Sequence, residues 1–74
     1  RVTLTLSMDP NSSTVYLDCD TEGIEYLIQR LQVVLRDGDH EHLFSPNWGG
    51  WELTGAEVRT DCLPVHHLRL TLTD

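Results

Sequence analysis

The chain has 74 residues, of which twelve are acidic and five are arginine, with no lysine, so its formal net charge at neutral pH is −7. A chain this short buries only roughly 60% of the surface that its unfolded form exposes, and a substrate pocket of ~300 Å³ or more would compete with its core, which argues against an enzyme. The negative charge repels phosphate backbones and argues against nucleic-acid binding, and no apolar run approaches the ~18 residues of a membrane-spanning helix, so a cytoplasmic protein is expected.

The first part of the chain predicts a β-hairpin. Apolar and polar residues alternate from Val2 to Met8, a period of two that is typical of a strand with one buried face. Residues 9–13 are rich in turn formers, and a second alternation runs from Thr14 to Cys19. Two strands joined by a short polar turn are therefore expected.

A helix is predicted from Asp20 or Thr21 to about Arg36, because the apolar spacing changes there to the helical period. Its apolar residues are Ile24, Leu27, Ile28, Leu31, Val34 and Leu35. Leu27 and Leu31 lie in the middle of this stripe, so both are expected to face the core, and truncating Leu31 to alanine is expected to cost ~2–5 kcal/mol. Gly38 is expected to end the helix in the left-handed conformation.

The second half of the chain predicts further strands. His40–Ser45 is expected to form a strand with Leu43 inward and with the imidazoles and Phe44 on the other face. Residues 46–50 are expected to form a turn or loop, residues 51–54 a short strand, and residues 55–64 a loop.

The last strand is expected from Val65 to Thr73, with His66 in phase with its leucines, buried and hydrogen-bonded. The resulting order is ββαβ(β)β. It predicts an α+β fold in a single domain, residues 1–74, in which one amphipathic helix packs on one face of a mostly antiparallel sheet of four to five strands.

Histidines and cysteines are the candidates for metal or catalytic chemistry. His40 and His42 lie on one face of their strand, and His67 would share that face if the third and last strands are neighbours, so a zinc site is one alternative. We favour histidines that line an exposed sheet face, because zinc sites usually show stronger clustering. Cys19 and Cys62 are expected to be free thiols, and nothing orients a base toward Cys62. No cofactor, metal or catalytic residue is therefore expected.

The residues around the two tryptophans form the most distinctive segment. Trp48 and Trp51 flank a Gly-Gly pair, which permits a tight reversal of the backbone. Tryptophan is enriched at the energetic centres of interfaces, but it is also well buried on average. Closure of the core is the favoured role for Trp48, and for Trp51 the two roles are equally weighted.

Acidic residues near this segment suggest a surface that binds a protein. Asp37, Asp39 and Glu41 fall within five positions, and Glu52 adjoins Trp51. If the sheet brings these segments together, they form a negative rim around an aromatic anchor, which suits a basic protein partner. The candidate partner-binding residues are Asp37, Asp39, Glu41, Trp48, Trp51 and Glu52. Solubility is the alternative explanation of the charge.

The C-terminal half of the chain resembles a known family. His-x-His-Leu from His40, Trp-Gly-Gly from Trp48, Glu-Leu-Thr from Glu52 and His-His-Leu-Arg-Leu from His66 look like the immunity protein 32 family of bacterial polymorphic toxin systems. Trp51 is not part of that pattern, and the resemblance brings no catalytic residue. It implies a small α+β protein of the bacterial cytoplasm that binds and occludes a cognate toxin domain.

Two alternatives to an immunity protein remain open on the residues alone. The first is a small metal-binding domain that uses His40, His42 and His67. The second is an oligomerising structural domain, such as a homodimer, whose exposed sheet face pairs with itself.

Overall fold

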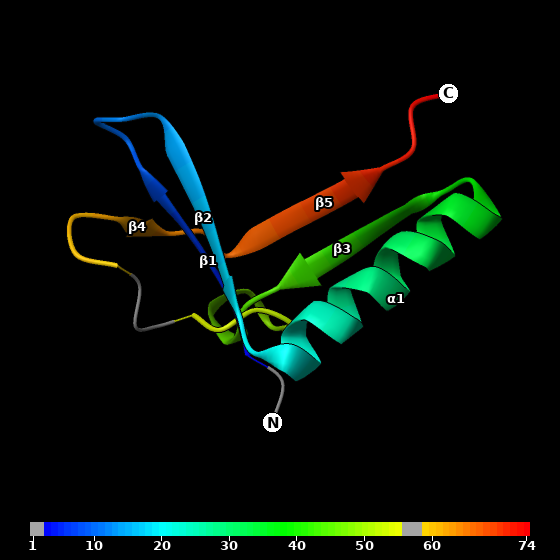
Figure 1. Cartoon of the computed structure of the whole chain (residues 1–74), viewed down its shortest axis with the longest axis horizontal. Coiled ribbons are helices and arrows are strands. Elements are labelled where there is room, and N and C mark those ends of the chain that lie inside the picture. The colour runs from blue at the N-terminus through cyan, green and yellow to red at the C-terminus, as the bar shows by residue number, and fades with distance from the viewer. Residues whose placement is uncertain (1–2, 56–58) are drawn as a thin grey trace.

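The computed structural model describes residues 3–55 and 59–74, which form one α-helix and five strands (Figure 1). In chain order the elements are β1 (Leu4–Asp9), β2 (Thr14–Cys19), α1 (Thr21–Asp37), β3 (His40–Phe44), a single 3-10 turn (Pro46–Trp48), β4 (Leu63–Pro64) and β5 (His67–Thr71). The α+β fold with antiparallel strands is confirmed. The expected strand at residues 51–54 does not form, and the predicted loop after it contains the short β4 and includes residues 56–58, which lie outside the described residues.

The strands form two sheets instead of the single sheet that the sequence suggested. One sheet has the order β2-β1-β4, and the other pairs β3 with β5. Figure 1 shows the β1–β2 hairpin diverging from α1, with β5 and β3 running between them. The chain passes from one sheet to the other at residues 65–66, where the Val65 N–H donates to the Leu6 carbonyl (2.9 Å) and the Ser45 N–H donates to the His66 carbonyl (2.9 Å).

The start of α1 is tied to the start of β1. The Asp20 carboxylate accepts hydrogen bonds from the N–H groups of Gly23 (2.6 Å) and Thr3 (3.1 Å), and these bonds lower the pKa of Asp20. A Cβ atom on Gly23 would overlap the Thr3 carbonyl oxygen, so only glycine fits this approach. At the other end, Gly38 adopts φ 69° and its N–H donates to Val34, which confirms the predicted left-handed cap.

The core lies where the two sheets and α1 meet. It is formed by Leu4, Leu6, Leu43 and Leu53, with the half-buried Cys19, Tyr26, Leu27, Val65, Leu68 and Leu70 packed around them. Both cysteines are free thiols, as expected. Leu53 is held in irregular backbone, because its N–H donates to the Phe44 carbonyl. Thr5 and Ser7, on the other face of β1, are buried too.

The predicted orientation of α1 is wrong for Leu31. The helix turns Val34 into the core and half-buries Leu27, whereas Leu31 stays 47% exposed. The close approach of Gly23 to β1 and the ion pair between Arg30 and Glu41 (3.1 Å) define which side of α1 faces the strands. Helical periodicity gives the width of an apolar stripe, but it does not say which part of the stripe is covered.

Replacing Leu31 by alanine is therefore expected to change the free energy of unfolding by less than about 1 kcal/mol, because little apolar area leaves a buried site and alanine is the better helix former. Chemical denaturation of dilute protein, at about 1 μM, measures the change. A loss of 2 kcal/mol or more would contradict the observed exposure of Leu31.

Candidate functional site

Trp51 and Tyr26 form an aromatic pair at the surface between α1 and the segment after β3. Their ring centroids are 5.4 Å apart at an interplanar angle of 56°. Trp51 is 67% exposed, while Tyr26 is half-buried against the core. Tyr26 thus supports one face of an indole whose remaining surface is open to solvent. A large, well-positioned and exposed aromatic side chain is typical of an anchor in a protein interface.

Two of the predicted acidic residues lie close to this pair. The Glu52 carboxylate accepts a hydrogen bond from the Trp51 N–H (2.7 Å), which restrains the backbone that carries the indole. Glu41, on the helix-facing side of β3, pairs with Arg30, whose guanidinium also lies 5.6 Å from the centre of the Tyr26 ring. Burial raises the pKa of Tyr26, and the negative charges of Glu52 and Glu41 add to that rise.

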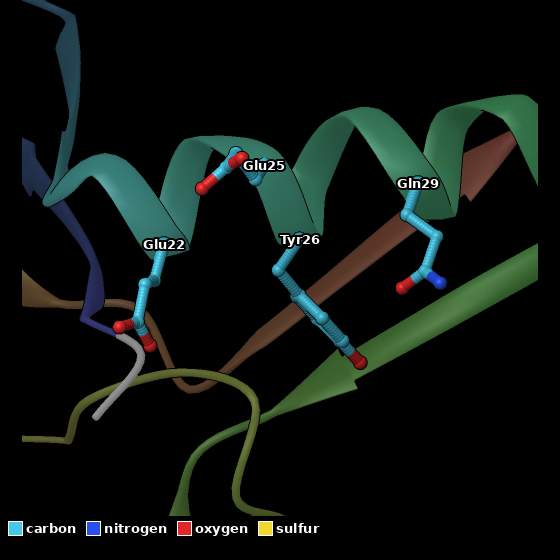
Figure 2. Close-up of a pocket in the computed structure, with 4 residues that line it drawn as sticks. All are labelled: Glu22, Glu25, Tyr26 and Gln29. Carbon is cyan, nitrogen blue, oxygen red and sulfur yellow. The ribbon is translucent and has the colours of Figure 1, made fainter.

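Beside the pair, α1 bears a shallow, open depression (Figure 2). It is lined by Glu22, Glu25, Tyr26 and Gln29, all on one flank of the helix. The depression is too open to sequester a small substrate, but its carboxylates add negative charge beside the aromatic pair. Tyr26 and these carboxylates were not among the predicted site residues; their i, i+3 and i+4 spacing was the sequence signal that they share a face.

The remaining predicted residues lie elsewhere. Asp37 and Asp39 precede β3, whereas Trp51 follows it, so the strand separates them along the chain by about 20 Å. Asp37 pairs with Arg36 (2.9 Å), and Asp39 accepts a hydrogen bond from His40 (2.8 Å). The structure therefore brings Glu41 and Glu52 near Trp51, while Asp37 and Asp39 lie at the far end of β3.

Trp48 does not close the core, which corrects the favoured expectation. Its side chain is 61% exposed and stacks on the His67 ring at 5.9 Å, on the face of β3 and β5 that points away from α1. The two tryptophans therefore belong to opposite faces of the β3–β5 pair. The reason is the turn at Ser45–Gly50, where Gly49 adopts φ 84° and reverses the chain between the two indoles.

The face that carries Trp48 is an array of stacked rings. The prediction that His40, His42, Phe44 and His67 share one face is confirmed, because Phe44 pairs with His67 and His42 with Arg69 across the two strands. His67 stacks on Phe44 (4.5 Å) and on His42 (5.0 Å), and the His42 Nδ1 and His67 Nε2 atoms share a hydrogen bond of 2.7 Å.

Metal coordination finds no support in this array. Among residues 3–55 and 59–74, no group of three or more histidine, cysteine, aspartate or glutamate side chains is arranged to hold a metal ion. One nitrogen of each ring, His42 Nδ1 and His67 Nε2, is instead used in their mutual hydrogen bond. His66 points elsewhere, since its Nδ1 shares a hydrogen bond with the Ser45 hydroxyl (2.8 Å), in agreement with the predicted hydrogen-bonded role.

Acidification is expected to destabilise the protein through His42. Burial lowers the pKa of His42, and the neighbouring His40, His67 and Arg69 lower it further, while Glu41 opposes them. The unfolded chain therefore binds more protons than the folded chain between the lowered pKa and the usual value of ~6.5, so stability is complete above that value and falls as the pH drops below it. When both rings are protonated, the hydrogen bond between His42 and His67 also loses its acceptor.

Thermal unfolding between pH 7.5 and pH 5 tests this expectation above the range in which carboxylates titrate. The melting temperature should fall with pH in the wild-type protein, and His42→Phe, which keeps an aromatic ring in the stack, should flatten that dependence. His40→Phe serves as the comparison and should weaken the dependence only in part, because it removes one of the groups that lower the pKa of His42 while His42 itself stays. A wild-type melting temperature that is the same at both pH values would contradict the role of His42.

Comparison with known protein families, characterised proteins and solved structures finds no match to this chain. The resemblance to the immunity protein 32 family thus rests on its residue motifs alone. In the part of the chain that the structure describes, no helix is both long enough and apolar enough to cross a lipid bilayer.

Proposed function

We propose that this chain is an immunity protein, which binds a cognate bacterial toxin domain and blocks it by occlusion. The observation that carries the proposal is the exposed Trp51, supported from beneath by Tyr26 and accompanied by Glu41, Glu52 and the carboxylates of the α1 depression. An aromatic anchor beside concentrated negative charge suits a partner with a basic surface, such as the cleft of a nuclease. The motif resemblance within residues 40–72 points to the same class of protein.

Binding without catalysis is the activity that this surface supports best. The depression on α1 is open to solvent and combines two carboxylates with a tyrosine and an amide, and it has no nucleophile held by a base. Excess negative charge also speeds the encounter with a basic partner, which matters for a protein that must reach its toxin before the toxin reaches its target.

The toxin domain encoded beside this gene provides the test. The purified chain should bind that domain in a one-to-one titration and suppress its activity, and expression of the chain should protect bacteria that express the toxin. An unrelated acidic protein of similar size and charge is the control, because charge alone must not protect. Failure of the chain to bind the toxin, or to protect cells while it is stably folded, would overturn the proposal.

A further inference from the structure

The helix α1 bears an apolar seam that the described part of the chain leaves uncovered. The seam consists of Ile24, Ile28, Leu31 and Leu35, which are 50%, 50%, 47% and 71% exposed. Together these side chains expose roughly 400 Å², an area comparable to the largest apolar patch on a typical soluble monomer, which is often functional. Isolated exposed leucines are ordinary, but a continuous row over three helical turns is a candidate interface.

The spacing of the seam is that of a helix which pairs with another helix. Its residues follow one another at intervals of four, three and four, the alternation of the d and a positions in a coiled-coil heptad. The seam also lies next to the buried side of α1, beside Leu27 and Val34, so a second helix placed there would extend the existing core. The seam therefore fits against a second helix whose apolar residues have the same heptad spacing.

We propose that the α1 seam is an interface between two copies of this chain, which pack helix against helix in antiparallel orientation. A closed dimer with twofold symmetry uses the same patch on both copies, so the patch must complement itself. In the antiparallel arrangement centred between Ile28 and Leu31, each Ile28 meets Leu31 of the second copy, and each Ile24 meets Leu35 of the second copy. All four positions of the seam then find an apolar partner.

The charges beside the seam select a second copy in this orientation. Glu25 and Arg36 lie on the same flank of α1, since eleven residues correspond to almost a whole number of helical turns. Antiparallel pairing about the centre of the seam places Glu25 of each copy within reach of Arg36 of the other, which gives two symmetric ion pairs. Parallel pairing would instead place the two Glu25 and Arg36 flanks on opposite sides of the interface, so these ion pairs could not form, and it would align the two helix dipoles unfavourably.

Arg36 is accessible for such a contact. Its side chain is 72% exposed, and among the residues that the structure describes it pairs with Asp37 at the helix end, itself 50% exposed, at 2.9 Å. An exposed ion pair of this kind contributes little to stability, so Arg36 can turn toward a second partner at small cost. The charges thus determine the relative orientation of the two helices, while burial of apolar surface provides most of the free energy of association.

The small buried area limits the affinity of the dimer. Pairing of two seams and their flanks buries on the order of 1,000 Å² in total, near the lower limit for specific interfaces. The net charge of −7 on each copy further opposes association. The dimer is therefore expected to be weak, with a dissociation constant on the order of 10 μM.

Dimerisation through the seam leaves the aromatic anchor of the proposed toxin-binding surface open, and the two proposed surfaces share only Glu25 at their edge. The seam and Tyr26 lie on opposite sides of α1, because Tyr26 follows Ile24 by two residues, or about 200° around the helix. The surface that carries Trp51 thus stays open in the dimer. A variant that cannot dimerise is expected to bind the toxin as a monomer, so the two proposals can fail separately.

Sedimentation velocity between about 1 and 200 μM tests the dimer. The wild-type chain is expected to shift from its monomer mass of 8.5 kDa to twice that mass over this range. Leu31→Arg should stay monomeric at every concentration. Leu63→Arg makes the same substitution at a leucine of similar exposure, 54%, on β4 and outside α1, and should dimerise as the wild type does. Circular dichroism verifies that both variants are folded.

A wild-type chain that is monomeric at 200 μM, or a Leu63→Arg variant that is as defective as Leu31→Arg, would overturn the proposal. The orientation has its own test in a background with Cys19→Ser and Cys62→Ser. A short thiol cross-linker should join Ile24→Cys protein to Leu35→Cys protein in a mixture. Efficient cross-linking of Ile24→Cys protein to itself would instead show parallel pairing and would contradict the antiparallel arrangement.

Discussion

Truncation of Leu43 to alanine is expected to lower the free energy of unfolding by about 2–5 kcal/mol, a large part of the stability of so small a protein. Leu43 is fully buried, pairs with Leu68 across β3 and β5, and belongs to the core cluster where the two sheets and α1 meet. Its removal leaves a cavity that cannot collapse easily, because the surrounding leucines come from β1, β5 and the irregular segment that holds Leu53. Chemical denaturation gives the loss directly.

Two matched substitutions make this result specific to burial. Leu31→Ala removes the same atoms from an exposed site and should cost little, while Leu43→Met keeps the volume at the buried site and should cost less than about 1.5 kcal/mol. Equal losses for Leu43→Ala and Leu31→Ala would mean that the two sheets do not share one core. Sequence periodicity predicted a loss of stability of this size for Leu31, whereas the burial seen in the structure assigns it to Leu43.

Local elements of this fold could be read from the sequence because local chemistry determines them. The alternation before and after residues 9–13 predicts β1 and β2, and the αL glycine after Asp37 marks the end of α1. The alternation in β3 also placed its imidazoles on one face, where the structure has them. Each of these features depends on neighbours within a few residues, which are visible in one sequence.

Features that depend on contacts between distant segments were not predictable. The division into two sheets results from the backbone at residues 65–66, where the chain passes from one sheet to the other. The Val65 N–H donates to Leu6 of β1, and the His66 carbonyl accepts from Ser45, which follows β3. The rotation of α1 depends on Gly23 against Thr3 and on Arg30 against Glu41, contacts 20 and 11 positions apart in the sequence. No periodicity within α1 contains that information.

The candidate site was predicted in part for the same reason. Glu52 adjoins Trp51 in the sequence and in the structure, whereas Glu41 is linked to this pair through Arg30 and Tyr26 of α1. Tyr26 was missed, because it reaches Trp51 across 25 positions. Trp48 was grouped with Trp51 through sequence proximity, although the reversal at Gly49 turns the two indoles to different faces.

Replacement of Trp51 by alanine is expected to weaken binding of the toxin by about 2 kcal/mol or more, which is roughly a 30-fold increase in the dissociation constant. The indole of Trp51 contacts the Tyr26 ring, and the backbone N–H of Trp51 donates to Glu52. Both contacts restrain Trp51 in the free protein, so less conformational entropy is lost when the indole enters a pocket on the partner. The loss should appear mainly as faster dissociation, because short-range packing is broken only after the complex has formed.

Trp48→Ala is the matched control, because Trp48 is almost as exposed as Trp51 but lies on the opposite face of β3 and β5. It should leave both rate constants close to those of the wild type. Asp39→Arg, an exposed change at the far end of β3, should slow association without changing dissociation, and added salt should mask the difference, as expected for long-range steering. If Trp48→Ala weakens binding and Trp51→Ala does not, the toxin binds the stacked-ring face, and the surface around Tyr26 is not the interface. Unchanged kinetics in all three variants would exclude both faces as the binding surface.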